Sequence, residues 1–117
     1  MILIRGRLVY KIRITNALFA EFKSLAESGN ANAQLKLGVM YKIGLAANQD
    51  YFEAVKWFRL AAERGNARAQ FNLGLMHYNG QGVRQDKSEA KRWFGLACDN
   101  QDQGACDNYK ILNEQGY

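Results

Sequence analysis

The segment GNARAQFNLGLMHYNGQGVRQDKSEAKRWFGLA at residues 65–97 repeats the segment GNANAQLKLGVMYKIGLAANQDYFEAVKWFRLA at residues 29–61. The two segments align at an offset of 36 residues without a gap. The identical positions, numbered in the first segment, include Gly29, Asn30, Ala31, Ala33, Gln34, Leu37, Gly38, Met40, Gly44, Asp50, Ala54, Trp57, Phe58 and Ala61. So many identities at one offset indicate an internal repeat, and a fixed period of this length predicts a stacked array of helical units.

Each repeat divides into two expected helices joined by a turn. Residues 31–43 carry apolar side chains at helical spacing, on Ala33, Leu37, Met40 and Tyr41. The turn covers residues 44–49, and its counterpart covers residues 80–85. Asp50 then stands where an N-cap belongs, with an acidic residue three positions later as in a capping box. The second helix carries one apolar stripe and ends at Gly65, which can supply the left-handed conformation of a helix C-terminus.

Two glycines, Gly38 and Gly74, fall inside the first helices of the two units. A glycine costs a helix interior about 1 kcal/mol relative to alanine, so a packing role is expected. We expect these glycines to allow close approach of the second helices through their small residues, which are Ala54, Ala61, Ala90 and Ala97.

The array is incomplete at both of its ends. Residues 17–28 predict a second helix without a first, and residues 103–114 predict a first helix without a second. The expected fold is therefore all-α, a right-handed α/α superhelical repeat solenoid with two full repeats and two half repeats over residues 17–117. Tyr109, Ile111 and Leu112 are apolar at the C-terminal end, where they either pack inward or meet another chain.

The first sixteen residues belong to no repeat and are expected to form a separate basic arm. Apolar residues at even positions alternate with Arg5, Arg7, Lys11 and Arg13, which is the period of a half-buried strand. An extended arm is therefore favoured, and its unpaired backbone suggests pairing with the same arm of a second copy, a possible homodimer. A degenerate first helix and an irregular segment lying on the body are the alternatives.

The charge distribution speaks against a nucleic-acid partner. The chain of 117 residues has 16 basic and 11 acidic side chains, for a net charge of +5. The arm contributes +4 of this charge, so the rest of the chain has a mixed, nearly neutral surface rather than a phosphate-binding face. No apolar run is long enough to span a membrane, and no secretory signal is evident, so a cytoplasmic location is the default expectation.

The spacing of Leu37, Gly38, Tyr41, Gly44, Asp50, Ala54, Trp57, Ala61, Ala62, Gly65 and Ala69 resembles the Sel-1-like repeat. The second copy is fuller, because Gly80-Gln81-Gly82-Val83 matches the turn of that family. The resemblance covers residues 17–114 and implies an α/α solenoid related to tetratricopeptide repeats, whose members typically act as adaptors. The third copy is degenerate, since Tyr109-Lys110 replaces the expected Leu-Gly.

Cys98 and Cys106 flank the expected turn between the last two helices. This stretch is similar to the bridged turns of the Helicobacter cysteine-rich proteins, a subgroup of the same family, and the resemblance implies a disulfide. A pair of free, partly buried thiols is the alternative. A disulfide would need an oxidising compartment, which would make a periplasmic or secreted location the better expectation.

Neither catalysis nor a bound cofactor is expected. With one histidine and two cysteines, the sequence offers no Ser–His–Asp set and too few ligands for a zinc site. His77 occupies the repeat position of Tyr41, where a packed or groove-facing role is expected. The resemblance to the cysteine-rich proteins also implies an alternative function, β-lactam binding or weak β-lactam hydrolysis, but the Lys-Thr-Gly motif of such enzymes is missing.

The preferred function is therefore a non-catalytic adaptor that binds a peptide or a small protein. Helical arrays bind partners on a concave surface, and the specificity comes from the non-core positions of the first helices. The residues at these positions are Asn32, Lys36, Arg68, Phe71, Asn72 and His77, with Phe71 as a possible apolar anchor.

Overall fold

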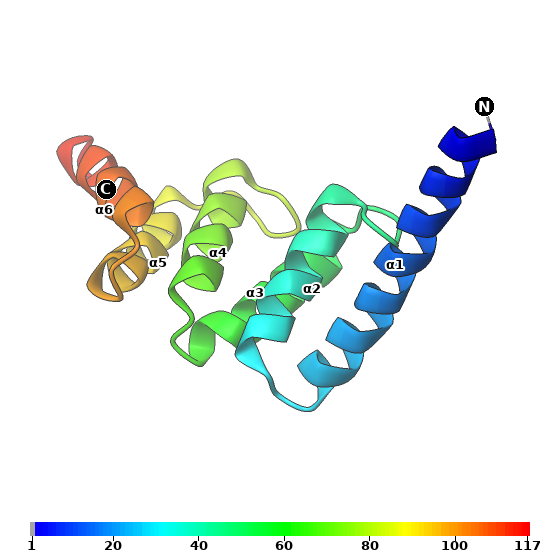
Figure 1. Cartoon of the computed structure of the whole chain (residues 1–117). Coiled ribbons are helices and arrows are strands. Elements are labelled where there is room, and N and C mark those ends of the chain that lie inside the picture. The colour runs from blue at the N-terminus through cyan, green and yellow to red at the C-terminus, as the bar shows by residue number, and fades with distance from the viewer. Residues whose placement is uncertain (1) are drawn as a thin grey trace.

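The computed structural model describes residues 2–117 and consists of six α-helices joined by short turns (Figure 1). The helices are α1 (Ile2–Glu27), α2 (Ala31–Ile43), α3 (Tyr51–Glu63), α4 (Ala67–Asn79), α5 (Lys87–Asp99) and α6 (Gln103–Glu114). The main packing contacts join helices that follow each other in the chain. Two complete helical pairs, α2–α3 and α4–α5, lie between α1 and α6, which confirms the predicted all-α repeat array.

Local sequence signals explain where the helices of the two pairs begin. Asn30 and Asn66 cap α2 and α4, and Asp50 and Asp86 cap α3 and α5, each through a side-chain oxygen that accepts from a backbone N–H three residues later. The first helices end at glycines in the left-handed conformation, with φ 75° at Gly44 and 69° at Gly80. The repeated signals thus produce repeated helix bounds.

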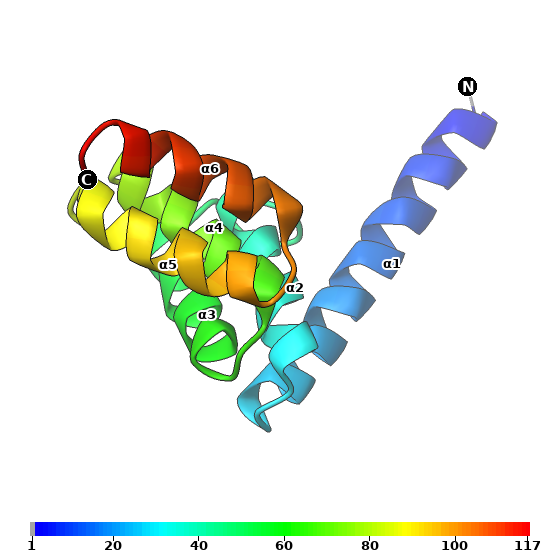
Figure 2. The ribbon, with the colours of Figure 1, turned by 90° about the vertical axis from the view of Figure 1, so that its left-hand side faces the viewer.

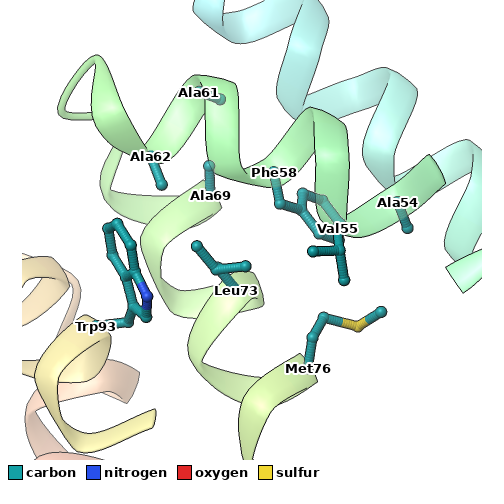
Figure 3. Packing of buried hydrophobic residues seen from close by; sticks show 9 residues of the cluster. All are labelled: Ala54, Val55, Phe58, Ala61, Ala62, Ala69, Leu73, Met76 and Trp93. Atoms are coloured by element: carbon teal, nitrogen blue, oxygen red, sulfur yellow. The ribbon is translucent and has the colours of Figure 1, made fainter. Parts of the chain in front are cut away.

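The core is built from the apolar stripes of neighbouring helices. Figure 3 shows Phe58 and Val55 of α3 facing Leu73 and Met76 of α4, with Trp93 of α5 closing the other side. These side chains are almost fully buried. A buried glutamine adds a polar tie in each unit, because Gln34 Nε2 donates to the Ala26 carbonyl and Gln70 Nε2 donates to the Ala62 carbonyl, both at 3.1 Å.

The two helix glycines lie closest to aromatic rings. A Cβ added to Gly38 would lie 2.6 Å from the Phe58 ring, and one added to Gly74 would lie 2.6 Å from the Phe94 ring. The nearest contacts of these glycines are therefore the rings, and not the small residues Ala54, Ala61, Ala90 and Ala97 that the sequence suggested. The glycine leaves a flat surface that a phenylalanine can cover, and this contact fills more space than two small residues could fill.

The N-terminal segment is helical, so the prediction of an extended arm is wrong. α1 runs from Ile2 to Glu27 and passes the boundary expected at residue 16 without a break (Figure 2). At the repeat offset, the positions of Gly44 and Asp50 are occupied by Leu8 and Ile14. The turn glycine and the N-cap are therefore both missing, and nothing ends the helix between residues 8 and 14. The alternative of a degenerate first helix agrees with the helical conformation, although no turn separates this helix from the one that follows.

The three apolar residues near the chain end differ in how deeply they are buried. Leu112 packs inward with 2% exposure, while Tyr109 and Ile111 are exposed. The disulfide between Cys98 and Cys106 joins α5 to α6, with the two Cα atoms 4.6 Å apart. The bridge implied by the family resemblance is therefore present, and the alternative of free thiols is wrong.

Candidate partner-binding groove

A groove of about 510 Å³ lies where α1, α2 and α4 meet, and we call it the α1–α4 groove. The residues that line it are Thr15, Leu18, Phe22, Leu35, Lys36, Val39, Met40, Leu45, Arg68 and Asn72. Most of them are apolar, and the two charged residues are both cations. A surface of this kind suits a partner that combines apolar side chains with carboxylates.

The two cations are positioned by aromatic rings. Lys36 Nζ lies 5.1 Å from the centroid of the Phe22 ring, which joins α2 to α1. The Arg68 guanidinium lies 4.4 Å from the centroid of the Phe71 ring and forms an ion pair of 3.3 Å with Asp102. The Arg68 side chain is 58% exposed. An exposed ion pair adds little stability, so Arg68 remains available to a second carboxylate from a partner.

Three of the six predicted binding residues meet at this groove. Lys36, Arg68 and Asn72 all line it, on adjacent first helices. Asn32 is exposed beside them, and its Oδ1 accepts from Asn66 Nδ2 at 3.2 Å. Lys36 and Arg68 are exposed, as expected for positions outside the core, whereas Asn72 is buried with 9% exposure. That these residues bind a partner stays a prediction.

The other two predicted residues lie elsewhere. Phe71 is half-buried and packs against Phe94, with the ring centroids 5.8 Å apart, at the edge of the buried cluster of α5 and α6. His77 is buried, and neither ring nitrogen has a hydrogen-bond partner within residues 2–117. Burial lowers the pKa of His77 below its ordinary value, against a weaker opposing effect of the Glu89 carboxylate. A neutral, buried histidine supports a packed role rather than a groove-facing one.

The α1 side of the groove was missed by the sequence reasoning. A second hollow of about 330 Å³ continues along α1, and its lining residues are Lys11, Ile12, Thr15, Asn16, Leu45 and Ala46. It shares Thr15 and Leu45 with the α1–α4 groove. The helical spacing of Ile12, Thr15, Phe19 and Phe22 was the signal that could have revealed this wall.

A smaller pocket of about 270 Å³ lies at the other end of the array. It is lined by Leu75, Tyr78, Asn79, Phe94, Asn108, Ile111 and Leu112. No charged residue lines it. It therefore lacks the combination of cations and apolar side chains that marks the α1–α4 groove.

The described residues were searched for metal-binding groups and for the motif of penicillin-binding enzymes. No group of three or more His, Cys, Asp or Glu side chains within residues 2–117 is arranged to hold a metal ion. The sequence reasoning overlooked that Ser88 and Lys91 have the Ser-x-x-Lys spacing found in penicillin-binding enzymes. Ser88 is exposed, and the Lys91 ammonium donates to the Tyr117 carbonyl oxygen, so the pair is not held together in a pocket.

The sequence model of the Sel1 repeat matches residues 31–66 and 67–102. The chain belongs to the Sel1 repeat family. The matched segments are the two complete repeats, so the resemblance seen in the sequence is confirmed. No curated protein matches the chain in sequence.

Three of the solved structures that resemble this Sel1 repeat protein are described here. The c5321 protein of uropathogenic Escherichia coli, a protective antigen with an SLR fold, is 39% identical with a TM-score of 0.80, over 84% of this chain and 21% of that protein. A Sel1 repeat protein from Oxalobacter formigenes is 33% identical with a TM-score of 0.80, over 84% of this chain and 40% of that protein. The present chain thus spans less than half the length of these two relatives.

The third structure is the cysteine-rich protein B of Helicobacter pylori. It is 19% identical to this Sel1 repeat chain with a TM-score of 0.73, over 88% of this chain and 92% of that protein. At this identity the likeness concerns the fold alone. It agrees with the array of consecutively packed helices described above.

Proposed function

We propose that this Sel1 repeat protein is a non-catalytic adaptor that binds a peptide or a small protein in the α1–α4 groove. The observation that carries the proposal is the gathering of Lys36, Arg68 and Asn72 on one apolar groove formed by three helices. Lys36 and Arg68 are exposed and charged and have no role in the helical core, so recognition of a partner is the function that they support best. Asn72 is buried at the base of the groove.

The disulfide supports a further part of the proposal, which concerns location. A Cys98–Cys106 bridge persists in oxidising compartments and is reduced in most cytosols. We therefore propose that the protein acts in the periplasm or outside the cell, in place of the cytoplasmic location expected by default. No helix among the described residues is long and apolar enough to cross a membrane.

The test compares two double variants with the wild-type protein. Lys36→Glu with Asn72→Asp reverses the charge of the groove, and Lys110→Glu with Asn113→Asp makes the same change in charge on exposed positions of α6. Because Asn72 is buried, the free energy of unfolding of the groove variant is measured as well, so that loss of binding is separated from the cost of a buried carboxylate. Each protein is immobilised and exposed to an extract of the source organism, and retained proteins are identified by mass spectrometry. Circular dichroism confirms that each variant keeps its helical content.

We expect a protein that is retained by the wild type and the α6 variant and lost from the groove variant. Retention that is equal on all three proteins would show that the groove is not the binding site. The same preparations are mixed with nitrocefin, and we expect no hydrolysis because no catalytic group lines the groove. Turnover of nitrocefin by wild-type protein would favour the alternative enzymatic function.

A further inference from the structure

Phe22 of α1 occupies the same position in the repeat as Phe58 of α3 and Phe94 of α5, since the three residues are spaced by 36. Phe58 and Phe94 are 0% and 1% exposed, and each covers a glycine of the first helix in its own pair. α1 has no first helix of its own within residues 2–117, because the chain continues as one helix through the positions where a turn would be. Phe22 is only half-buried and faces the α1–α4 groove.

The groove therefore includes the place where a first helix would pack in a complete repeat. Leu18 and Phe22 of α1 hold the positions of Ala54 and Phe58, which contribute to the core in the next repeat. In α1 these two side chains line the groove, and Leu18 is 41% exposed. An occupying helix would cover apolar surface that the repeat buries elsewhere.

The charges of the groove restrict what that helix can be. Lys36 and Arg68 line the groove itself, and Lys11 lines the hollow that continues it along α1. No acidic side chain lines either space among the described residues. A helix that carries carboxylates beside its apolar face is attracted to this surface, whereas a basic helix is repelled.

We propose that the α1–α4 groove takes an acidic amphipathic helix of a different protein, which sets a glycine or alanine against the Phe22 ring and carboxylates against Lys36 and Arg68. This inference rests on the proposed adaptor function and adds the chemistry of the partner. The small residue is required for the reason seen at Gly38 and Gly74, where a Cβ would lie 2.6 Å from the covering ring.

A second copy of this chain does not fit the groove. Among the described helices, α6 holds the place of the first helix of a pair, and no second helix follows it. It is therefore the segment that could pack on α1 of another copy. The residue of α6 at the position of Gly38 and Gly74 is Lys110. Its side chain would occupy the space of the Phe22 ring, and its charge would add to Lys36 and Arg68.

The test is a selection from a displayed library of helical peptides of 13 residues, which is the length of α2 and α4. All positions of the peptide are randomised. The bait is the wild-type protein, and Leu45→Glu serves as counter-bait because Leu45 is exposed on the groove and its replacement places a carboxylate there. We expect enriched peptides to share a glycine or alanine flanked by aspartate or glutamate at helical spacing.

The selected peptide is then synthesised with a fluorescent label, and its binding is measured by fluorescence anisotropy. We expect Phe22→Ala to weaken binding at least about tenfold, as for an interface residue at the centre of a contact. Phe52→Ala is the matched control, since Phe52 is 77% exposed on α3 and should leave the affinity unchanged. Replacing the small residue of the peptide by leucine should weaken binding by a similar factor.

Several results would overturn the inference. These are an absence of enrichment over the Leu45→Glu counter-bait, enrichment of basic peptides or of bulky residues in place of the small one, and equal affinity for wild type and Phe22→Ala. Gel filtration with light scattering adds a fourth, because a dimer that Phe22→Ala dissociates would assign the groove to a second copy. Circular dichroism separates loss of binding from loss of folding.

The inference and the proposed function can fail separately. A natural partner that is lost from the Lys36→Glu, Asn72→Asp variant but retained by Phe22→Ala would leave the adaptor function standing and remove the inference. A partner retained by both variants would remove both, since neither the charged nor the aromatic part of the groove would then be in use.

Discussion

The two ends of the helical array are finished in opposite ways. At the C-terminal end, a disulfide ties α6 to α5, and Arg68 of α4 pairs with Asp102 at the start of α6. At the N-terminal end, α1 packs mainly on α2 and leaves Ile12, Ile14 and Leu18 exposed. The difference teaches that the same repeat can be cross-linked at one end and held by packing alone at the other, and the groove lies at the end without cross-links. Apolar side chains are exposed at both ends, since Tyr109 and Ile111 are exposed on α6.

The largest expected effect compares the packing of α1 with the packing of α3 inside the array. Phe58→Ala should lower the free energy of unfolding by about 3–5 kcal/mol, because the ring is fully buried on Gly38. Phe22→Ala, at the same position of the repeat, should cost only about 1 kcal/mol, since one side of its ring faces the groove. Denaturant titrations followed by circular dichroism measure both. Equal losses would show that α1 is packed as tightly as α3.

The next prediction concerns removal of the disulfide between α5 and α6. Replacing Cys98 and Cys106 together by serine should lower the free energy of unfolding by about 2 kcal/mol, because the bridge closes a short loop that the unfolded chain would otherwise leave free. Hydrogen exchange should accelerate in α6 and stay unchanged in α1. The wild-type protein with a reducing agent is the control, and faster exchange in all six helices alike would contradict the comparison.

A third substitution compares the glycine position inside the array with its counterpart on α6. Gly74→Ala should destabilise the protein by about 1–3 kcal/mol, because the new Cβ meets the Phe94 ring and this overpacking outweighs the gain in helix propensity. Lys110→Ala, at the same repeat position on exposed α6, should change stability by less than about 0.5 kcal/mol. Thermal unfolding of both variants decides this, and a stabilising Gly74→Ala would be inconsistent with the close ring contact.

The smallest effect distinguishes the two complete units, which carry Tyr41 and His77 at the same position. The pKa of His77 is lowered by burial, so the unfolded chain takes up the proton first as the pH falls. The full stability is therefore present above about pH 6.5, the ordinary histidine value, and is lost as the pH falls through the lowered pKa. His77→Tyr should remove this loss and raise the free energy of unfolding by about 1 kcal/mol, since it removes two unpaired buried nitrogens.

Denaturant midpoints between pH 7 and pH 5 provide the measurement. The hydrogen bond with Arg92 lowers the pKa of Glu89 below its ordinary value. Protonation of Glu89 therefore changes the stability only at lower pH than this range. A wild-type profile that the His77→Tyr variant reproduces between pH 7 and pH 5 would assign the change to another group.

The sequence was most informative where helix signals are local. Residues 31–43 and 103–114 were predicted as helices and match α2 and α6, because the asparagine and aspartate caps and the turn glycines each act within a few residues. Residues 17–28 were predicted as a helix, whereas the N-terminal part of α1 was predicted as a strand because its apolar residues at positions 4, 8 and 12 satisfy both an alternating pattern and a helical one. The choice between the two depended on missing stop signals, which a repeat alignment extended to residues 8–14 would have exposed.

The candidate site was predicted only in part for a related reason. Lys36 and Arg68 follow from their place on the first helices, since the repeat fixes which positions leave the core, whereas Asn72 lines the groove from a buried position. The wall contributed by Thr15, Leu18 and Phe22 depends on how α1 packs, which no local pattern determines. Phe71 and His77 do not line the groove, because an aromatic or polar residue at a first-helix position can turn toward the neighbouring helix instead.

The packing of each helix mainly on its neighbours in the chain has a consequence for folding. Contacts between neighbours close short loops, so the contact order is low and folding should be fast for the chain length. Such an array behaves as a one-dimensional zipper, in which structure nucleates on one helical pair and spreads outward. With the C-terminal pair stapled by a disulfide, unzipping should start at α1, and a ligand that clamps α1 to α2 and α4 would slow the unfolding of the entire chain.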